Sequence, residues 1–401
     1  MKQQLTIGLD AKRIVRNGTG LGSYGRTLAN DLADIEELNL RLYAPDEGRS
    51  ELRTQVAERS NLHFVYPHSS LPSPLHSPHS SFLSPLFSPL SSLYKAYWRS
   101  RGIVRQLTAD GVDLFHGLSG ELPVGIRQTG IKTVVTIHDL IFLRHPEYYN
   151  WIDVQIYRRK FMQTIKEADR IVAISECTRR DIAQLGNIPE ERIDLIYQSC
   201  APRFSAEVEA SVIGQVRTRY SLPQRYVLSV GTIEERKNTL LALKALHWLP
   251  ADVSLVLVGR ATKYTQRIID TARQENLTSR LHILHGVPDE HLPALYAAAE
   301  AFVYPSRYEG FGIPVIEAIR MRLPVVACTG SCLEEAGGPD NLYVRPDDAE
   351  GMAAAISKVL KGADGRQQRI ERSLAYIRRF ENNDAALRFA DLYHQLLDSN
   401  P

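Results

Sequence analysis

The sequence is short of the features that mark secreted, membrane-spanning and metal-stabilised proteins. It holds only four cysteines in 401 residues, too few and too scattered for a disulfide framework. Cys328 and Cys332 have no matching second pair, which argues against a structural zinc site. No run approaches the roughly 18–20 apolar residues that a spanning helix needs. The amino terminus MKQQLTIGLDA lacks the apolar stretch of a signal peptide, so we expect a cytoplasmic protein.

Neither sign of charge is in marked excess. The chain has 48 Lys and Arg against 46 Asp and Glu, a formal net charge of +2, which argues against a general nucleic-acid binder. Its 44% hydrophobic and 23% charged residues are ordinary for a soluble globular protein. A chain of 401 residues is long enough for two domains, each with its own core.

One segment lacks formal charge altogether, from Ser60 to Tyr94. Within it, residues 67–92 hold six prolines and ten serines, and this proline density excludes a regular helix. Two interpretations stay open: a mobile surface loop, or a flap that touches a membrane or a substrate. The basic and aromatic residues at 93–101 suit either an anionic lipid interface or ordinary packing with a solvated charged face.

Apolar strands and amphipathic helices alternate along almost the whole chain. Continuous apolar strands separated by helices are typical of parallel sheets covered on both faces. In the first half the pattern predicts strands over residues 5–11, 38–45, 61–67, 112–117, 132–139, 170–176 and 192–198. In the second half it predicts strands over 226–231, 254–260, 281–286, 301–306 and 324–328. Helical patterns lie between them, at about 21–34, 93–109, 150–168, 177–185, 237–249, 265–276, 289–299 and 314–322.

Two such series in succession predict two Rossmann-like domains. The strand–helix rhythm breaks near residues 198–210, so we assign 1–205 to an N-terminal domain and 206–385 to a C-terminal domain. We expect the final helical segment, 386–401, to cross back onto the first domain. Ligands of such folds bind at the carboxyl ends of the strands, so the expected site is the cleft between the domains.

Two glutamates, Glu309 and Glu317, stand eight positions apart in the segment SRYEGFGIPVIE. Residues 300–306 read as a buried strand. Residues 314–321 have helical spacing, with Pro314 suited to the first helical position. The spacing therefore predicts Glu309 in a strand-to-helix loop and Glu317 in the first helical turn.

The loop between these glutamates has unusual backbone freedom. Gly310 and Gly312 let the backbone approach a ligand without Cβ clashes. Free amides at the start of the following helix attract phosphate or sugar hydroxyls. A carboxylate beside them suits a hydroxyl-rich ligand, because it only accepts hydrogen bonds. The alternative is that Glu317 only complements the helix dipole and that Glu309 is a solvated loop acid.

Two adjacent cations follow the strand at 226–231. In GTIEERKN (231–238), Gly231 permits a tight turn, and Arg236 and Lys237 stand at the end of the loop. A planar guanidinium beside a point ammonium suits a diphosphate. Such a pair could neutralise a leaving group as its charge develops. The alternative is a solvated basic pair.

Two further features belong to the first half of the chain. The glycine run NGTGLGSYG (17–25) echoes a phosphate-cradling turn, although such a loop alone is weak evidence. No Walker lysine follows it, which argues against a P-loop ATPase. His138 and Asp139 end the strand at 132–139, and a histidine at that end of a strand points into the cleft. The alternative is a structural histidine bonded to the backbone.

Taken together, these motifs resemble a known family. EGFGIPVIE resembles the Glu-x7-Glu motif of the family 4 retaining glycosyltransferases, and GTIEERKN resembles their phosphate-binding loop. Residues 285–318 look like the family's donor-site region almost without a gap. IHD, VAISECTRRDI and GLDAKRIVRNGTGLGSYGR fit its bacterial mannosyltransferase-like branch. The resemblance covers most of the chain and is densest over 226–336. It implies a GT-B fold with the active site between two Rossmann-like domains.

The resemblance also implies roles for individual side chains. Arg236 and Lys237 match the family's diphosphate binders. Glu317 matches the acid that holds the ribose hydroxyls. Glu309 matches the acid that faces the donor sugar, and His138 matches the histidine near the reacting centre. Transfer would run from a nucleotide diphosphate-sugar, with retention at the anomeric carbon and without a metal or other cofactor.

Other matching residues would touch the donor without reacting. An acidic Asp289 beside the base could accept from guanine N1 and N2, which favours a GDP-sugar over a UDP-sugar. The Ser/Pro-rich insert departs from the family, where that region is usually charged and helical, so the resemblance implies no acceptor-binding role for it. The donor-contacting set comprises Gly20 and Leu21 of the first domain, the backbone amides of Gly310, Phe311 and Gly312, and Val287 and Asp289 near the base.

The expected function is transfer of a hexose, with mannose suggested by the branch, to a saccharide or lipid-linked saccharide in envelope polysaccharide or lipopolysaccharide synthesis. The expected partners are the donor, the acceptor and a peripheral membrane surface, with no nucleic acid. Two alternatives stay open at this point. One is another GT-B enzyme such as a nucleotide-sugar epimerase. The other is a non-catalytic nucleotide-sugar-binding partner.

Overall fold

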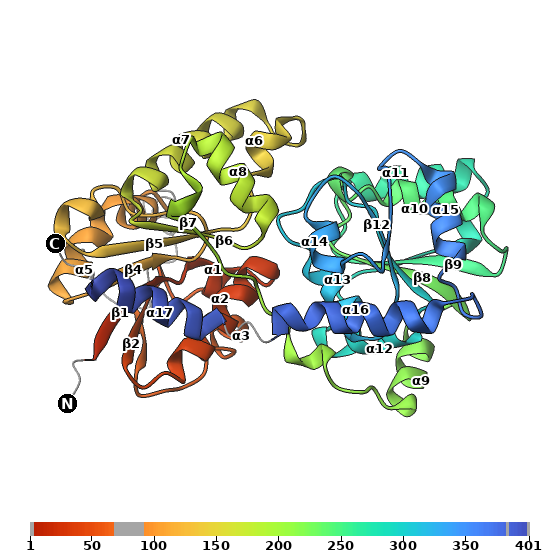
Figure 1. The fold of residues 1–401 in the computed structure, drawn as a ribbon, viewed down its shortest axis with the longest axis horizontal. Helices are drawn as coiled ribbons and strands as arrows, with labels where there is room; N and C mark the ends of the chain where they lie inside the picture. Colours follow the sequence, from red (N-terminus) through yellow and green to blue (C-terminus); the bar gives the residue numbers. More distant parts are fainter. Residues whose placement is uncertain (1–3, 68–91, 382–384, 399–401) are drawn as a thin grey trace, which may run out of the picture.

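The computed structural model describes residues 4–67, 92–381 and 385–398. Its two lobes lie side by side along the longest axis (Figure 1). Each lobe contains one sheet, with strand orders β3-β2-β1-β4-β5-β6-β7 and β10-β9-β8-β11-β12-β13. Every pairing in both sheets is parallel, as the continuous apolar strands predicted. The charge-free insert falls almost wholly at 68–91, outside the described residues.

The first sheet is built from short, mostly buried strands. β4 and β5 are buried at nearly every position, because helices cover both faces of the sheet. The strands are β1 (Leu5–Asp10), β2 (Leu38–Tyr43), β3 (Leu62–Val65), β4 (Leu114–Gly117), β5 (Lys132–Ile137), β6 (Arg170–Ala173) and β7 (Ile193–Leu195). The helices are α1 (Lys12–Arg16), α2 (Gly20–Ala33), α3 (Ser50–Arg53), α5 (Ile103–Ala109), α6 (Ile141–Arg144), α7 (Trp151–Glu167) and α8 (Glu176–Gly186), with a further helical segment at 92–97 leading into the π-helix Trp98–Gly102.

The second sheet repeats this plan. β9, with the sequence VSLVLV, is buried along its whole length. Its strands are β8 (Arg225–Val230), β9 (Val253–Val258), β10 (Leu281–Leu284), β11 (Ala301–Tyr304), β12 (Val325–Cys328) and β13 (Leu342–Val344). Its helices are α9 (Ala210–Arg219), α10 (Thr239–Ala245), α11 (Lys263–Gln274), α12 (Leu292–Ala298), α13 (Ile313–Arg320), α14 (Leu333–Gly337), α15 (Ala349–Ser357) and α16 (Arg366–Glu381). β13, α14 and α15 were not predicted from the sequence.

Local capping explains where the longer helices begin. The Asn150 side chain accepts a hydrogen bond from the amide of Ile152 and starts α7. The Ser175 side chain does the same for the amide of Thr178 and starts α8. These polar caps satisfy amides that have no partner within their own helix.

The last helix, α17 (Ala385–Asp398), belongs to the first lobe although it follows the second sheet. α16 packs on α13 and α14, whereas α17 packs on α2 across the molecule (Figure 1). Phe389 and Tyr393 of α17 are fully buried in the core of the first lobe. The Tyr393 hydroxyl also lies 2.6 Å from Nδ1 of His116 at the end of β4. The predicted return of the chain to the first domain is confirmed.

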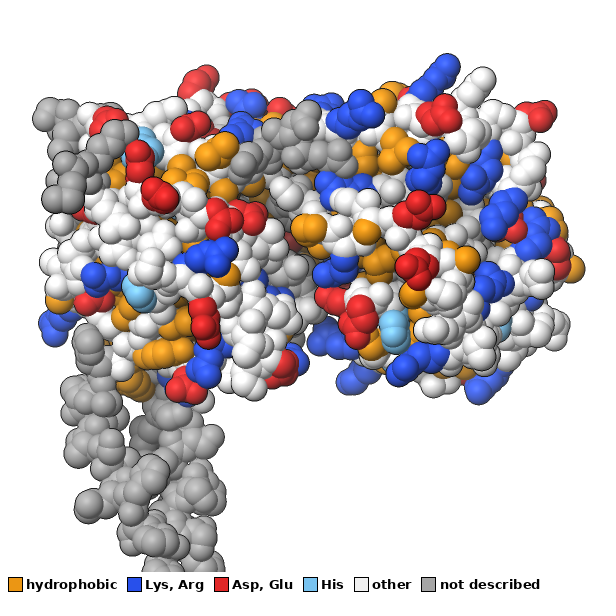
Figure 2. All heavy atoms as spheres, turned by 90° about the horizontal axis from the view of Figure 1, so that it is seen from below, with side chains coloured by type: hydrophobic (Ala, Val, Ile, Leu, Met, Phe, Trp, Pro, Cys, Tyr) orange, Lys and Arg blue, Asp and Glu red, His pale blue; other side chains and the backbone are white. Residues whose placement is uncertain are grey.

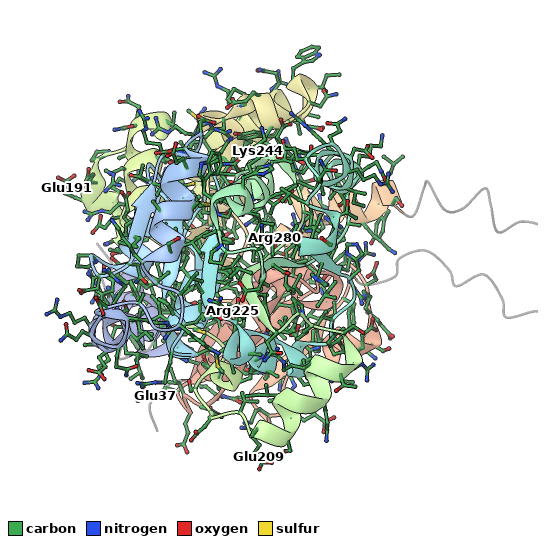
Figure 3. The ribbon with its side chains drawn as sticks, turned by 90° about the vertical axis from the view of Figure 1, so that its right-hand side faces the viewer. Glu37, Glu191, Glu209, Arg225, Lys244 and Arg280 are labelled. Atoms are coloured by element: carbon green, nitrogen blue, oxygen red, sulfur yellow. The ribbon has the colours of Figure 1, made fainter. Side chains whose placement is uncertain are left out.

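Two arginines stabilise the second sheet at the amino-terminal ends of its strands. Arg225, at the start of β8, forms a bidentate pair with Glu300, with N–O distances of 2.7 and 3.1 Å. Arg280 donates to backbone carbonyls including those of Val253 and Leu246. Both arginines are labelled in the view onto the end of the second lobe (Figure 3). These contacts hold the strand starts, and the opposite ends carry the polar side chains of the cleft.

Acidic and basic side chains are interspersed on the face seen from below, with no field of one sign (Figure 2). This mixture agrees with the net charge of +2. Among the described residues, no helix is both long and apolar enough to cross a membrane. The predicted boundary at 205/206 falls between the end of β7 at Leu195 and the start of α9 at Ala210.

Candidate active site

The predicted cations and the loop glutamate meet at neighbouring strand ends. β8 and β11 are adjacent in the second sheet, and the loops that follow them carry Arg236 and Lys237 on one side and Glu309 on the other. An Nη1 atom of Arg236 lies 3.0 Å from Oε2 of Glu309, and Nζ of Lys237 donates to Oε1 of Glu309. All three side chains are between 11% and 15% exposed, so the alternative of solvated surface charges is wrong.

Burial and charge act in opposite directions on this cluster. Burial alone would raise the pKa of Glu309, but Lys237 and Arg236 lower it to about 2. Burial opposes the charge on Arg236 too, yet Glu309 and Glu234 raise the pKa of its guanidinium overall. The hydroxyl of Ser306 adds a 2.6 Å hydrogen bond to Oε1 of Glu309. Glu309 is therefore a fixed carboxylate across the physiological pH range.

These cations face the first lobe. Asp139, just beyond β5, is partly buried, and desolvation raises its pKa, which Arg236 and Lys237 are near enough to oppose. Lys237 also donates to the hydroxyl of Tyr304, with an N–O distance of 2.6 Å, and lines a small pocket at the end of β8. The two cations thus lie on the side of the second lobe that meets the first, where an anionic ligand could replace Glu309 as their partner.

The loop at 309–312 presents backbone amides beside these cations. Gly312 has a φ of 112° and is the N-terminal cap of α13, a conformation that L side chains rarely adopt. The backbone amides of Gly310, Phe311 and Gly312 donate no hydrogen bond to any of the described residues. Amides without partners at the start of a helix suit an anion or a sugar hydroxyl.

Glu317 lies deeper in α13 than the sequence suggested. Because Gly312 caps the helix, Ile313 is its first residue, Pro314 its second and Glu317 its fifth. The predicted place in the first helical turn is wrong, and so is the idea that Glu317 only complements the dipole there. Instead, Oε2 of Glu317 accepts a 2.8 Å hydrogen bond from the hydroxyl of Tyr296. Burial raises the pKa of Glu317 to about 7, despite this bond.

The residues assigned to the nucleotide base lie on the Glu317 side of the second lobe. Oδ2 of Asp289 is 3.1 Å from an Nη2 atom of Arg203, and the Asp289 side chain is 71% exposed. Arg203 and Asp289 both influence the pKa of Glu317, so the three charges share one neighbourhood. Val287 is half-buried against the adjoining core. An exposed carboxylate here is free to rearrange toward a ligand.

His138 is held through both nitrogens of its ring. Nε2 lies 2.9 Å from the carbonyl oxygen of Leu118 and therefore carries the proton. Nδ1 accepts from the side-chain amide of Gln198 at 2.7 Å. Burial lowers the pKa of His138 to about 4, so the ring is neutral at physiological pH. Tyr24 packs edge-on against it at 4.8 Å. A ring with no free lone pair orients its surroundings rather than acting as a strong base.

The glycine run forms the start of helix α2. α1 lies between β1 and this run, and α2 begins at Gly20. Gly22 is required because an added Cβ would lie 1.7 Å from the carbonyl oxygen of Asn17. Gly20 and Leu21 form the first turn of α2, one turn before Tyr24, which touches His138. They therefore approach the site from the first lobe.

The side chains that join the two lobes were not predicted. Ser175 and Thr178 donate to the carbonyl oxygen of Gly310 at 2.6 and 3.1 Å. The Tyr308 hydroxyl donates to Oδ2 of Asp181 at 2.6 Å. The helix cap at Ser175 could have been predicted from SECTRRD, but its partner in the other lobe could not.

Two facing parallel sheets, with a buried Arg–Lys pair and open backbone amides at their carboxyl ends, define a class of enzyme that binds an activated anionic substrate between two Rossmann-like domains. The sequence profile described as Glycosyltransferase Family 4 matches residues 19–199, and that described as Glycosyl transferases group 1 matches residues 217–375. The chain therefore belongs to the family 4 glycosyltransferases and is a glycosyltransferase.

Characterised relatives come from the same family. The O-antigen chain mannosyltransferase B of Escherichia coli is 30% identical over 288 residues, which is 71% of this chain and 74% of the relative. The O-antigen chain mannosyltransferase RfbU of Salmonella typhimurium is 28% identical over 249 residues, 62% of this chain and 65% of the relative. The serotype-specific mannosyltransferase WbdA of Escherichia coli is 30% identical over 261 residues, 62% of this chain, but the match spans only 32% of the relative.

Solved structures show the same fold. A glycosyltransferase from Rickettsia africae superposes with a TM-score of 0.75 at 16% identity, with 100% of both chains covered. Anabaena Alr3699/HepE in complex with UDP and glucose has a TM-score of 0.70 at 17% identity, covering 98% of this chain and 100% of that one. The GT-B fold expected from the resemblance is confirmed.

Proposed function

We propose that the protein transfers mannose from a nucleotide diphosphate-sugar to a saccharide acceptor in the synthesis of a surface polysaccharide. The curated relatives named as O-antigen mannosyltransferases support the sugar and the process. One observation carries the site assignment: Arg236 and Lys237 are mostly shielded from solvent, with side chains 14% and 15% exposed, and are paired with Glu309. A diphosphate would offer these cations oxygens in place of the carboxylate.

The reaction needs charge stabilisation at the departing diphosphate. As the bond between the anomeric carbon and the phosphate oxygen breaks, negative charge grows on that oxygen beside Arg236 and Lys237. Removing one such donor from a dry site typically costs about 3 kcal/mol of barrier. In a front-face reaction with retention, the departing oxygen takes the proton of the acceptor hydroxyl as the new glycosidic bond forms. His138 then orients the reacting groups, consistent with its two occupied ring nitrogens.

We propose that this stabilisation is independent of a metal ion, because two fixed cations and the amides at 310–312 supply the positive charge. A chelator tests it directly. Enzyme treated with EDTA and assayed in metal-free buffer should keep its transfer rate within about twofold, and added Mg²⁺ should not raise it. Loss of turnover on chelation, restored by Mg²⁺, would contradict the proposal.

The donor base is proposed to be guanine. The exposed carboxylate of Asp289, close to Glu317, can accept from guanine N1 and N2, whereas uracil lacks that pair of donors. GDP should therefore bind at least about tenfold more tightly than UDP by calorimetry, and Asp289→Ala should remove most of the difference. Equal affinities in the wild-type protein would contradict this assignment.

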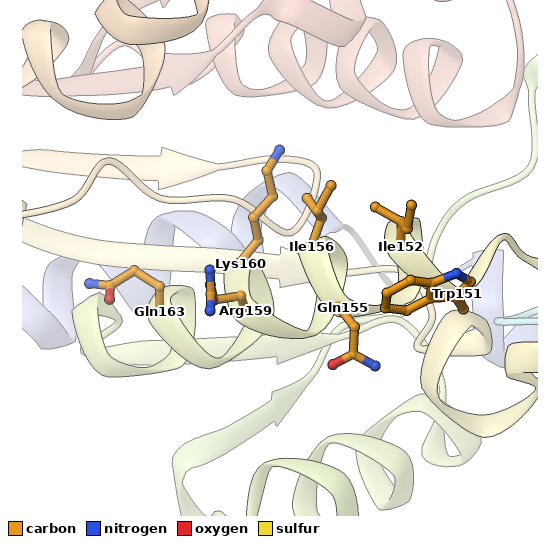
Figure 4. Close-up of a pocket in the computed structure, with 7 residues that line it drawn as sticks. All are labelled: Trp151, Ile152, Gln155, Ile156, Arg159, Lys160 and Gln163. Atoms are coloured by element: carbon orange, nitrogen blue, oxygen red, sulfur yellow. The ribbon is translucent and has the colours of Figure 1, made fainter.

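A peripheral membrane contact is proposed for the exposed face of α7. The buried side of this helix holds Val154 and Phe161, but its other side carries large apolar groups in solvent. Trp151 is 71% exposed, Ile152 51% and Ile156 47%. In Figure 4, Ile152, Ile156 and Lys160 project from one side of the helix, where seven α7 residues line a depression of about 540 Å³.

Basic residues complete this α7 face. Arg158 and Arg159 are exposed beside the apolar positions, a combination that suits a bilayer with anionic headgroups. Vesicles of phosphatidylglycerol should sediment the protein, and vesicles of phosphatidylcholine should not. Trp151→Ala with Ile156→Ala should abolish sedimentation. Concentration-dependent dimers that dissociate in the double variant, without vesicle binding, would contradict the membrane contact.

One assay tests the reaction itself. The purified protein is incubated with GDP-mannose, with and without a mannose-terminated oligosaccharide, and the products are identified by mass and anomeric configuration. The proposal expects an oligosaccharide longer by one α-linked mannose, formed only with acceptor present. An altered sugar nucleotide formed without acceptor would indicate an epimerase instead.

A further inference from the structure

The two lobes touch directly at the candidate active site, through the amino end of α8. We infer that Ser175 and Thr178 are positioning residues that orient the donor-sugar loop, 309–312, from the opposite domain. The kinetic test of this inference rests on the proposed transferase reaction. The test of its structural basis does not.

Both hydroxyls converge on a single backbone oxygen. Oγ of Ser175 donates to the carbonyl of Gly310 at 2.6 Å, and Oγ1 of Thr178 donates to it at 3.1 Å. The Thr178 hydroxyl also lies 3.2 Å from the carbonyl oxygen of His138. Ser175 is 0% exposed and Thr178 is 2% exposed, so water cannot replace either donor readily. The single proton of the Thr178 hydroxyl thus lies between the carbonyl oxygens of His138 and of the donor loop, and can be shared between them.

These two hydrogen bonds also fix the direction of the next backbone amide, because the peptide unit is planar. In a trans peptide, the carbonyl of one residue points opposite to the amide of the next, so fixing the carbonyl of Gly310 fixes the amide of Phe311. The neighbouring peptides are held from within the second lobe. Sγ of Cys332 contacts the carbonyl oxygens of Glu309 at 3.1 Å and Phe311 at 2.7 Å, which orients the amides of Gly310 and Gly312. Within the part of the chain that the structure describes, the hydrogen bonds from the other domain to this loop go to the middle peptide.

Further contacts keep α8 in register with this loop. The carboxylate of Glu335, in α14, accepts from the amides of Glu176 at 2.8 Å and Cys177 at 3.3 Å. A carboxylate at the amino end of α8 also complements the helix dipole. The Tyr308 hydroxyl donates to Asp181 of α8 at 2.6 Å. Closure of the lobes therefore completes the row of three amides, and opening them releases the middle one.

The test removes the hydroxyls while keeping side-chain volume. Thr178→Val is close to isosteric, Ser175→Ala removes the second donor, and Thr178→Ser restores a hydroxyl. Thr218→Val, at an exposed position of α9, is the matched control. Transfer from GDP-mannose should fall about tenfold in Thr178→Val and about 100-fold in the double variant. Thr178→Ser should recover most of the rate, and Thr218→Val should lose none.

If Ser175 and Thr178 only stabilised the fold, their removal would lower GDP affinity and Tm together with the transfer rate. GDP lacks the sugar, and Arg236 and Lys237, which would bind its diphosphate, are unchanged in these variants, so GDP affinity should fall much less than the transfer rate. Small-angle scattering should show a larger radius of gyration for the double variant than for Thr178→Ser. Wild-type rates in the double variant, no recovery in Thr178→Ser, or a parallel loss of GDP affinity and Tm would each overturn the inference. If the wild-type protein transferred no sugar, the proposed function would fail, and an unchanged radius of gyration in the double variant would then overturn the positioning role separately.

Discussion

Gly310 lies directly against the backbone of His138, although the two residues belong to different domains. A Cβ added at Gly310 would lie 2.0 Å from the carbonyl oxygen of His138, a distance that real Cβ atoms do not show. The neighbour is backbone rather than the end of a flexible side chain. Either the lobes must separate or the donor loop must move before any side chain can be accommodated at Gly310.

Gly310→Ala should therefore cost the transfer reaction far more than it costs the fold. A displacement of about 1 Å at a reacting centre can lower a rate by 100-fold, so we expect a loss of at least that size. Gly214→Ala is the matched control, because its Cβ would meet no atom within 4 Å in helix α9. That control should keep full activity and gain roughly 0.5–1 kcal/mol of stability. Activity of Gly310→Ala near the wild-type level would show that the two backbones separate during turnover.

Glu309→Gln should uncouple nucleotide binding from transfer. The substitution removes the carboxylate that occupies Arg236 and Lys237, so GDP should bind equally well or up to about tenfold more tightly. Transfer should fall about 100- to 1000-fold if, as we propose, this charge faces the donor sugar. Calorimetry with GDP and single-turnover kinetics would separate the two effects. Glu350→Gln, at an exposed position of α15, is the control, and a tenfold loss of GDP affinity in Glu309→Gln would contradict the pairing described here.

Arg236→Ala should impair both binding and transfer. Its guanidinium contacts Glu309 and the carbonyl oxygen of Tyr308, so its removal loses a diphosphate donor and loosens the donor loop. We expect GDP affinity to fall about 10- to 100-fold and the transfer rate to fall further. Arg267→Ala removes an exposed arginine that pairs with exposed Glu235, and it should change neither quantity. Equal, small effects in both variants would remove Arg236 from the mechanism.

Contacts within one domain could be predicted from the sequence, whereas contacts between the domains could not. Arg236 and Glu309 were assigned to strand-end loops, and their meeting follows because β8 and β11 are neighbours in the sheet. The bond from Thr178 to Gly310 spans 132 positions and exists only because the domains dock. No periodicity within one domain reports such a contact.

Local backbone detail limited the remaining predictions. The left-handed conformation of Gly312 starts α13 one residue before Pro314, which moves Glu317 out of the first turn. α1 separates β1 from the glycine run, so that run begins a helix instead of following the strand directly. In both cases the residue types were recognised correctly, but their helix boundaries depended on dihedral angles that the sequence does not fix.

Glu317 predicts a stability that depends on pH in a defined direction. Its pKa is about 7 in the folded protein, raised from a value of 4.5 for an ordinary glutamate. Between these values the folded state binds more protons than the unfolded state, so this group makes the free energy of unfolding decrease as pH rises through 4.5 to 7. Glu317→Gln removes the dependence. Urea unfolding should show the variant gaining stability relative to wild type between pH 5 and pH 8, since the glutamine amide does not take up a proton in this range.

Ionisation of the same carboxyl should strengthen donor binding as pH rises, although it lowers the stability of the fold. Only the ionised form can accept hydrogen bonds from both ribose hydroxyls through its two oxygens, so the KM for GDP-mannose should fall as pH rises from 6 to 8. His138 cannot produce this trend, because its pKa of about 4 keeps it neutral throughout that range. In Glu317→Gln the KM should be high and insensitive to pH. A wild-type KM that stays constant from pH 6 to 8, together with a normal KM in Glu317→Gln, would place the ribose elsewhere in the cleft.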